Sequence, residues 1–328
     1  MTWRKKALTV GFEVSSKLYL RINKVVNGSG LEITRLDGAT KLQLNFLLCK
    51  LCINMVLFKA KDYIPELDLI IKNKFEKLNT ESKLGVVYIG KNHDFQKFVG
   101  IKKSIAESYG IELEEFSFNT STKKSQILDA IKKIGVSDEY GGIVVQYPFP
   151  AKYSYNEISE LINPKKDVDF FSPEVFGKFV LGCYSEFMPP TVRALDFLLN
   201  NFKLEIRGQK CVVIGQGVLV GRPISFYLMN KGATLISLNE HSRQKRKVLE
   251  DADLVITATG SASSLRGEWL KRGASLIDFS SNILGSDFDK MSDYSHLNLV
   301  SLSPGGMGPL TVRFLFLNFL EFIERSWS

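Results

Sequence analysis

Cysteine and histidine are scarce in this sequence. Its 328 residues include four cysteines and three histidines, His93, His241 and His296. Cys49 and Cys52 form a Cys-x-x-Cys pair, but no second pair follows and the histidines are scattered, so four zinc ligands are hard to assemble. We therefore expect no metal site, and such sparse use of cysteine fits a reducing, cytoplasmic setting.

Long hydrophobic runs are absent too. The most apolar stretch near the N-terminus, residues 42–58, is interrupted by Gln43, Asn45, Lys50 and Asn54. A membrane-spanning helix needs about 20 mostly apolar residues, so no membrane anchor is expected. The preceding residues are of mixed polarity, which disfavours a secretory signal, while their basic, acid-poor composition leaves a transit peptide open.

The net charge of +8 is unevenly distributed. Residues 1–54 hold nine Lys or Arg and three Asp or Glu, a net +6, whereas the remainder holds 34 basic and 32 acidic residues, a net +2. A nucleic-acid-binding face would place the excess on the folded body, so we expect no nucleic-acid partner. We interpret residues 1–54 as a basic extension that need not belong to the fold, with Met55 as the natural start.

Helical and strand patterns alternate after Met55. The first half predicts helices at residues 65–78, 95–109 and 125–134 and strands at residues 84–89, 112–118 and 142–146. After Pro189 and Pro190, the second half predicts helices at residues 192–202, 223–231 and 310–323 and strands at residues 210–214, 234–238, 254–258 and 275–277. Such alternation is typical of parallel sheets with crossover helices, and the length favours two domains.

A glycine-rich turn joins the strand at residues 210–214 to the following helix. It contains Gly215, Gln216, Gly217 and Gly221. Glycines allow a tight turn and a close approach of the backbone to a pyrophosphate, which the helix N-terminus attracts. A purely structural turn is the alternative, but the order of strand, glycines, helix and strand favours dinucleotide binding.

The choice between NAD and NADP stays open. Glu240, near the end of the second strand, could accept the ribose hydroxyls of NAD, whereas Ser242, Arg243 and Lys245 could hold the 2′-phosphate of NADP. We expect Thr257, Thr259 and Gly260 to bind the cofactor, because they lie at the end of the predicted strand 254–258, where the nicotinamide half would pass. An ordinary transition from strand to loop is the alternative.

Three further segments resemble one known family. Gly142 to Pro150 (GIVVQYPFP), Lys166 to Asp169 (KDVD) and Pro304 to Thr311 (PGGMGPLT) are similar to motifs of the bifunctional methylenetetrahydrofolate dehydrogenase/methenyltetrahydrofolate cyclohydrolase family. The resemblance implies oxidation of methylenetetrahydrofolate with NADP or NAD, then hydrolysis of the methenyl product to formyltetrahydrofolate in one-carbon metabolism. It also implies a homodimer joined through its nucleotide domains.

The resemblance also implies roles for single residues. Lys102 falls on the family's catalytic lysine, Gln146 on its glutamine partner and Asp169 on the aspartate that binds the pterin ring. From composition alone, Lys102 would be one more solvated lysine of its helix. The residues expected to line the substrate site are Phe98, Pro148, Pro304, Gly305 and Gly306.

Three positions depart from the family pattern. Phe98 replaces a tyrosine, Phe170 replaces the glycine after KDVD, and Gln216 replaces an arginine of the glycine turn. These changes keep two alternatives open, a dehydrogenase with impaired or lost cyclohydrolase activity and a catalytically inactive binding paralogue. A shikimate-type dehydrogenase is a further alternative that the three motifs disfavour.

The expected fold class is α/β with two domains. Residues 55–190 and 303–328 would form an N-terminal catalytic, folate-binding domain completed by the C-terminal helix, and residues 191–302 a Rossmann-type dinucleotide-binding domain.

Overall fold

The computed structural model describes residues 8–14, 18–24, 55–90, 93–183, 187–261, 263, 265–280, 285–289 and 291–326. At residues 8–14, 18–24, 93–98 and 326 the description covers the backbone alone. The chain divides into two compact units, Met1–Ile53 and Asn54–Ser328.

The described residues of the first unit form two β-strands. Strands β1 (Leu8–Val14) and β2 (Leu18–Lys24) run antiparallel, with Leu8 opposite Lys24 and Val14 opposite Leu18. The remainder of the predicted basic extension, including the apolar stretch up to residue 54, lies outside the described residues.

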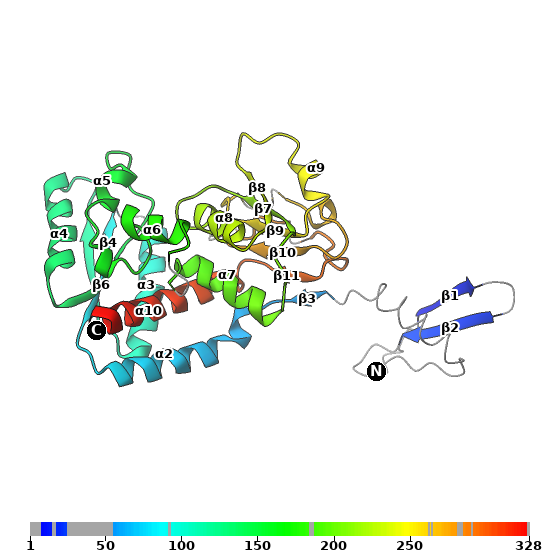
Figure 1. The fold of residues 1–328 in the computed structure, drawn as a ribbon, viewed down its shortest axis with the longest axis horizontal. Coiled ribbons are helices and arrows are strands. Elements are labelled where there is room, and N and C mark those ends of the chain that lie inside the picture. The colour runs from blue at the N-terminus through cyan, green and yellow to red at the C-terminus, as the bar shows by residue number, and fades with distance from the viewer. Residues whose placement is uncertain are drawn as a thin grey trace. The chain divides into compact units, whose positions relative to one another are not determined.

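The second unit contains a three-stranded and a six-stranded sheet, and every strand pair in both is parallel (Figure 1). The predicted two-domain α/β class is confirmed. The smaller sheet has the order β5-β4-β6, with the bounds Leu113–Phe118, Lys83–Ile89 and Tyr140–Val145. Its central strand is buried from Leu84 to Ile89, which explains its unbroken run of apolar residues.

The larger sheet has the order β3-β11-β10-β9-β7-β8. In that order the strands span Val56–Leu57, Leu299–Ser301, Ser275–Asp278, Leu254–Thr257, Lys210–Ile214 and Thr234–Leu238. The chain leaves β7 for β8 on one side and returns to β9 on the other. The strand order therefore reverses between β7 and β9, and in such sheets ligands bind beyond the carboxyl ends of the strands at this point.

Strands β3 and β11 of this sheet were not predicted. Val56 and Leu57 pair with β11 at the end of the six-stranded sheet, so the beginning of the second unit adds a strand to the sheet that holds the glycine turn. Two residues are too few to show the alternation that reveals a strand in a sequence.

The long helices lie where the hydrophobic spacing predicts them, within a few residues at each end. They are α2 (Ile64–Leu78), α3 (His93–Tyr109), α4 (Lys124–Val136), α7 (Pro190–Asn201), α8 (Gly221–Asn230) and α10 (Met307–Ser326). Short elements were missed: α5 (Tyr155–Ser159), α6 (Pro173–Val180), α9 (Lys245–Leu249) and the 3-10 turns η2 (Ala60–Asp62), η3 (Pro164–Lys166) and η4 (Gly267–Trp269).

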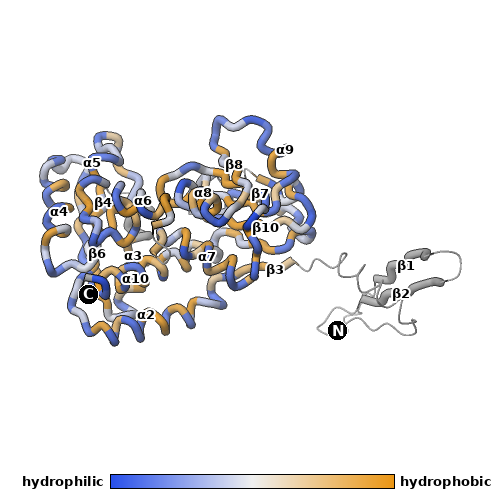
Figure 2. Tube along the Cα trace, viewed as in Figure 1, coloured by the Kyte–Doolittle hydropathy of each residue, from blue (hydrophilic) through white to orange (hydrophobic). Residues whose placement is uncertain are grey.

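Helix α10 packs against α7, α2 and β6 (Figure 1). Its Phe316 and Phe319 are fully buried. Figure 2 shows hydrophobic and hydrophilic residues alternating along helices such as α2 and α4, as expected of helices with one apolar face. The approach of α10 to β6 depends on small residues. A Cβ atom on Gly142 would lie 2.7 Å from the Val168 side chain and 2.8 Å from that of Phe319.

We expect Gly142→Ala to reduce the free energy of unfolding by about 1–3 kcal/mol, because the added methyl group overpacks the contact between β6 and α10. Urea unfolding measures the change. Gly177→Ala is the control. Gly177 lies inside α6 with nothing within 4 Å of its Cβ position, so alanine there should stabilise the protein by about 0.5–1 kcal/mol through helix propensity. Equal effects at the two positions would contradict the packing argument.

Candidate active site

Three polar residues meet beyond the carboxyl edge of the three-stranded sheet. Lys102 lies in α3, which follows β4, and Gln146 directly follows β6. The backbone N–H of Gln146 donates to the carbonyl of Val87 at 2.8 Å and so prolongs the pairing of β4 with β6. A bridge between Ile143 and Asp167 brings the segment containing Asp169 alongside β6.

Lys102 and Gln146 form a direct hydrogen bond. The Lys102 Nζ atom donates to Gln146 Oε1 at 2.7 Å. Gln146 Nε2 donates to the carbonyl of Tyr147 at 3.2 Å, which turns the amide oxygen towards the lysine. The partner of the lysine is therefore an oriented but neutral group, and it fixes the amine without supplying a countercharge.

Lys102 and Asp169 influence each other's protonation. Burial lowers the pKa of Lys102, and the charge of Asp169 opposes this effect. Burial raises the pKa of Asp169 to about 6, and the charge of Lys102 opposes that effect. In both groups the loss of hydration outweighs the attraction between the charges, so both incline towards their neutral forms.

The backbone around Asp169 is held by its neighbours. The buried Asp167 carboxylate accepts hydrogen bonds from the amides of Phe171 at 2.8 Å and Ser172 at 2.7 Å. Lys166 Nζ donates to the carbonyl of Ser137, just beyond α4, at 2.6 Å. These supports were not recognised in the sequence, because the groups that Asp167 binds are backbone amides, which no residue type marks.

Phe170 occupies the position where the family pattern has glycine. Its φ of 59° lies in the left-handed region, which costs a residue with a side chain about 1–2 kcal/mol. The ring is buried and contacts Phe179 and Phe322, with ring centroids 6.2 Å away in each case. Burying a phenylalanine side chain contributes about 1.5–3 kcal/mol, which offsets the backbone strain.

The residues expected to line the substrate site are not all adjacent. Phe98 lies in α3, but its side chain is outside the described residues. Pro148 is exposed after a cis peptide bond from Tyr147, beside Gln146. Pro304 and Gly305 line a hollow of about 390 Å³ whose other walls come mainly from residues 57–64, and Lys102, Gln146 and Asp169 are not among its lining residues.

Glycine is sterically required at two positions of the glycine turn. A Cβ atom on Gly215, where φ is 106°, would lie 2.5 Å from the Ala258 carbonyl oxygen, and one on Gly221 would lie 1.9 Å from that of Gly215. Gly217 has nothing within 4 Å of its Cβ position, so packing does not demand glycine there. The crowded turn lies where the strand order reverses and precedes the N-terminus of α8, which fits the pyrophosphate of a dinucleotide.

Gln216 is fastened to the end of β8. Its Nε2 atom donates to Ser237 Oγ at 3.1 Å, and its Oε1 atom accepts from Asn239 Nδ2 at 3.0 Å. Glu240 and Arg243 are exposed beyond this strand. The Ser242 hydroxyl accepts a hydrogen bond from the backbone N–H of Asn239 at 2.9 Å. Of the residues expected at the ribose, Glu240 and Arg243 therefore offer the exposed side chains.

A buried carboxylate organises the loop after β9. Asp287 accepts hydrogen bonds from the Thr257 hydroxyl, from the Thr259 amide at 2.7 Å and from the Ser261 amide at 3.1 Å. Thr257 is itself fully buried, so its hydroxyl supports the loop from inside, and its expected contact with a cofactor stays a prediction. Thr259 and Gly260 are exposed on the loop. Asp287 was missed because it lies 28 residues from the Thr259 amide that it binds.

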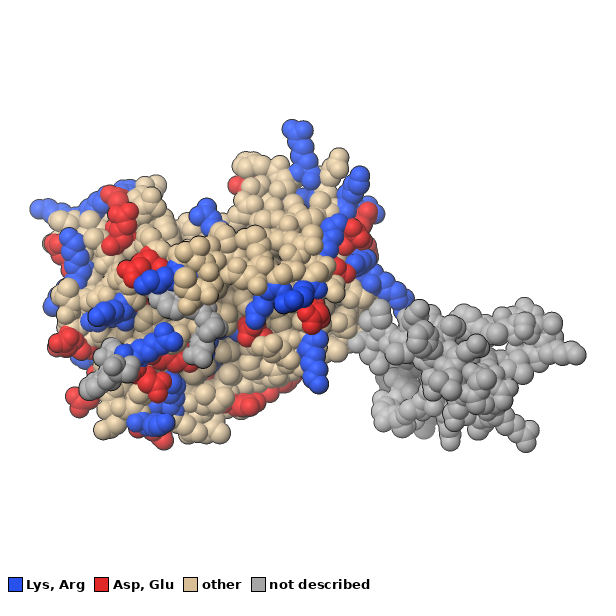
Figure 3. All heavy atoms as spheres, viewed as in Figure 1, with Lys and Arg blue, Asp and Glu red and all other residues tan. Residues whose placement is uncertain are grey.

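The described part of the chain shows neither a candidate metal cluster nor a helix suited to cross a membrane. It contains no cluster of three or more His, Cys, Asp or Glu side chains suited to a metal ion. None of its helices is both long and apolar enough to cross a bilayer. On the face shown in Figure 3, acidic and basic side chains are intermixed over the described body.

The models of two domains from one family match the chain. The catalytic domain of tetrahydrofolate dehydrogenase/cyclohydrolase matches residues 59–169, and the NAD(P)-binding domain of tetrahydrofolate dehydrogenase/cyclohydrolase matches residues 189–327. Together these matches span most of the second unit.

Curated proteins and solved structures of the same family are similar to the chain. Bifunctional protein FolD of Staphylococcus saprophyticus is 32% identical over 271 residues, which cover 80% of this chain and 93% of that protein. Bifunctional protein FolD 2 of Arabidopsis thaliana is 30% identical, with 79% and 90% covered. The crystal structure of the FolD methylenetetrahydrofolate dehydrogenase/cyclohydrolase from Campylobacter jejuni superimposes with a TM-score of 0.78 at 29% identity, with 83% and 99% covered.

We expect Gln216→Arg to shift the ratio of the Kd values for NAD and NADP about tenfold towards NADP. The added guanidinium group would bind the 2′-phosphate, which only NADP carries. A hydrogen bond to a charged group contributes about 1.5–3 kcal/mol, and about 1.4 kcal/mol corresponds to a factor of ten. Titration of each dinucleotide by protein fluorescence measures the ratio. Gln216→Leu, which breaks the fastening to β8 without adding charge, should leave the ratio unchanged. A ratio within twofold of the original for the arginine variant would show that position 216 does not face the 2′-phosphate.

Proposed function

Because the chain belongs to the tetrahydrofolate dehydrogenase/cyclohydrolase family, we propose that Lys102, Gln146 and Asp169 carry its folate chemistry. The protein oxidises 5,10-methylenetetrahydrofolate to the 5,10-methenyl form with NADP or NAD and hydrolyses this product to 10-formyltetrahydrofolate. The observation that supports the residue assignment most directly is the 2.7 Å hydrogen bond between Lys102 and Gln146.

Asp169 binds the pterin ring in this proposal. An ionised carboxylate can accept two parallel hydrogen bonds from the amino-pyrimidinone edge of the ring. The supports of the backbone on either side of Asp169 restrict the positions that its carboxylate can take. Phe98, Pro148, Pro304, Gly305 and Gly306 are proposed as walls of the folate site.

Lys102 moves the protons of the hydrolysis. The oxygen of a water molecule bonds to the methenyl carbon while the neutral amine of Lys102 takes one water proton. Cleavage of the bond from that carbon to N5 then places a proton on N5 and leaves the formyl group on N10, and one proton is released to solvent. The lowered pKa of Lys102 makes its neutral form accessible, and Gln146 holds the amine in position.

The dinucleotide accepts the hydride of the oxidation when it is bound. We propose that Gly215, Gly217 and Gly221 hold its pyrophosphate, that Gln216, fastened to the end of β8, lies near its ribose, and that Thr257, Thr259 and Gly260 lie on the side of the nicotinamide. Glu240, Ser242 and Arg243 remain candidates for contacts with the ribose or its 2′-phosphate. These residues belong to the proposed dinucleotide domain, residues 191–302, and the folate residues to the proposed catalytic domain, residues 55–190 and 303–328.

Homodimer formation and a cytoplasmic location complete the proposal. The family supports a dimer joined through the nucleotide domains, and β8 ends the order of the six-stranded sheet in the described chain. Sparse cysteine supports a reducing compartment. Sedimentation equilibrium of the purified protein tests the dimer, and a monomer at micromolar concentration would count against it.

We expect Lys102→Met to lower the rate of methenyltetrahydrofolate hydrolysis by about 100-fold or more, because general acid–base groups contribute about 10²–10⁴-fold. The decay of methenyl absorbance in the near ultraviolet measures the rate. Lys103→Met is the matched control. Lys103 is the next residue of α3 and forms an ion pair with Glu115 at 3.2 Å, so its loss should leave hydrolysis unchanged. Unaltered hydrolysis in the Lys102 variant would remove this lysine from the mechanism.

We expect folate binding to weaken as the pH falls through about 6. The pKa of Asp169 is raised to about 6, so the carboxylate that accepts the pterin hydrogen bonds is ionised above this pH and protonated below it. The Kd should rise about tenfold per pH unit below the pKa. Fluorescence titration with folic acid between pH 5 and 8 measures this. Asp169→Asn should bind more weakly at pH 8 and lose this dependence, and a variant that kept the same pH profile would refute the assignment.

A further inference from the structure

Asn318 is a polar residue in the middle of an apolar helix. It lies in α10 next to the buried Leu317 and Phe319, and its side chain is completely buried. A buried amide is costly unless its donors and acceptor are paired. Its position therefore calls for specific partners.

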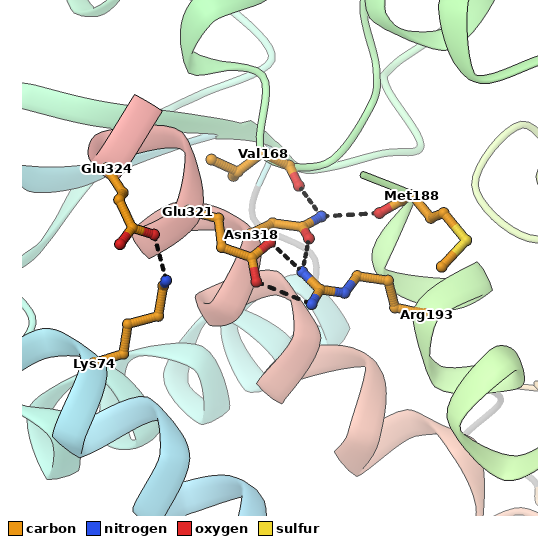
Figure 4. Close-up of polar contacts among 7 residues, drawn as sticks. All are labelled: Lys74, Val168, Met188, Arg193, Asn318, Glu321 and Glu324. Carbon is orange, nitrogen blue, oxygen red and sulfur yellow. Dashed lines mark hydrogen bonds and ion pairs between the residues drawn. The ribbon is translucent and has the colours of Figure 1, made fainter. Parts of the chain in front are cut away.

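Three groups pair with the Asn318 amide (Figure 4). Its Nδ2 atom donates to the carbonyl of Val168 at 3.0 Å and to that of Met188 at 3.1 Å. Its Oδ1 atom accepts from Arg193 Nη1 at 2.6 Å. The amide thus joins three segments that come from different parts of the chain.

Arg193 determines which way the amide faces. Its guanidinium group also binds both carboxylate oxygens of Glu321, at 2.7 and 3.1 Å, and only 16% of the arginine side chain is exposed. Because arginine can only donate, the Asn318 oxygen must face it and the nitrogen must face the two carbonyls. The orientation of the amide is therefore enforced.

The two carbonyls lie beside the two halves of the site. Val168 immediately precedes Asp169, the proposed pterin ligand. Met188 lies two residues before the start of α7, and Thr191 in the first turn of α7 donates to the carbonyl of Leu219 at 2.8 Å. Leu219 lies between Gly217 and Gly221 of the glycine turn. A chain of bonds thus leads from the Asp169 backbone through Asn318 and α7 to the proposed pyrophosphate site.

We propose that Asn318 is a positioning residue. Its side-chain amide holds the segment before Asp169 and the segment before α7 together, through its hydrogen bonds to the carbonyls of Val168 and Met188. It thereby sets the position of the pterin ligand and the distance between the folate and the dinucleotide. The inference rests on the proposed function, because it takes Asp169 as the pterin ligand. Asn318 does not touch the substrate and acts through Val168 and Met188.

The test replaces Asn318 by leucine in the full-length chain. Leucine is similar in size but cannot form the three hydrogen bonds. We expect the KM for the folate to rise about tenfold in both reactions, because displacement of a binding group by about 1 Å can cost on the order of 100-fold. The kcat of the dehydrogenase should fall about a further tenfold relative to the kcat of the cyclohydrolase, assayed directly with the methenyl substrate. Only hydride transfer needs the two ligands at a fixed distance, so the ratio reports on their separation.

Arg313→Met is the matched control. Arg313 lies in the same helix, is mostly buried and donates to Asp68 at 3.0 Å, without contact to Val168 or Met188 through that bond. Its loss should lower the melting temperature but leave the folate KM and the ratio of the two kcat values unchanged. A role of Asn318 in stability alone would give this same pattern in Asn318→Leu, and that result would overturn the proposal.

Arg193→Met provides a second route if the leucine variant does not fold. It frees the Asn318 oxygen but keeps both donated bonds, so we expect the same changes at smaller size. An unchanged folate KM and kcat ratio in this soluble variant would overturn the proposal. Asp169→Asn separates the two levels of the argument. If it leaves folate binding unchanged, the proposed function fails, whereas a weakened Asp169 variant beside an unaffected Asn318 variant refutes the positioning role alone.

Discussion

The hydrogen bond between Lys102 and Gln146 is the interaction on which the proposed folate chemistry depends. A carboxylate in place of the Gln146 amide would stabilise the ammonium ion and raise the pKa of Lys102, so that the amine could no longer take a proton near neutral pH. The neutral amide orients the lysine and leaves the effect of burial intact. The parallel sheet makes this possible, because it brings the end of β6 and the helix that follows β4 to the same edge.

Glycine residues allow close contacts between elements at three other places in the structure. Gly142 lets α10 and the Val168 side chain approach β6. Gly215 lets the turn after β7 press against the loop after β9, and Gly221 lets the start of α8 approach the Gly215 carbonyl. In each case a single methyl group would collide with backbone or buried side chains. The close contacts between these elements therefore require glycine. The adjoining segments are held by hydrogen bonds from their backbone groups to the side chains of Asp167 and Asp287 and by the bond that Asn318 donates to a backbone carbonyl.

Sequence reasoning recovered the features that carry a periodic or motif signal. The long helices, the central strands and the glycine turn follow from spacing. Resemblance to a family pointed to Lys102, Gln146 and Asp169, whose roles stay predictions. Strand β3 and helix α5 were missed because they are too short to show a period. Asp167 was missed because its partners are backbone amides, which no residue type marks. Asp287 and Asn318 were missed because they bind backbone groups 28 and 150 residues away, whose position only the fold determines. The burial of Thr257 beneath the loop likewise has no mark in the sequence.

In the proposed site, a bound substrate would change the pKa values of Lys102 and Asp169. Before binding, loss of hydration inclines both Lys102 and Asp169 towards neutrality. A methenyl cation brought close to them favours the ionised carboxylate and disfavours the ammonium ion, so it lowers both pKa values. Displacement of water by the ring lowers the pKa of Lys102 further but opposes the change at Asp169. The cation therefore prepares the lysine as a base on both counts, while the carboxylate stays ionised only if the attraction of the cation outweighs its burial. Hydrogen bonds from the pterin edge favour the charged form of Asp169 as well. This second contribution explains how one substrate can hold a neutral amine beside an ionised acid, whereas both groups are charged in an ordinary ion pair.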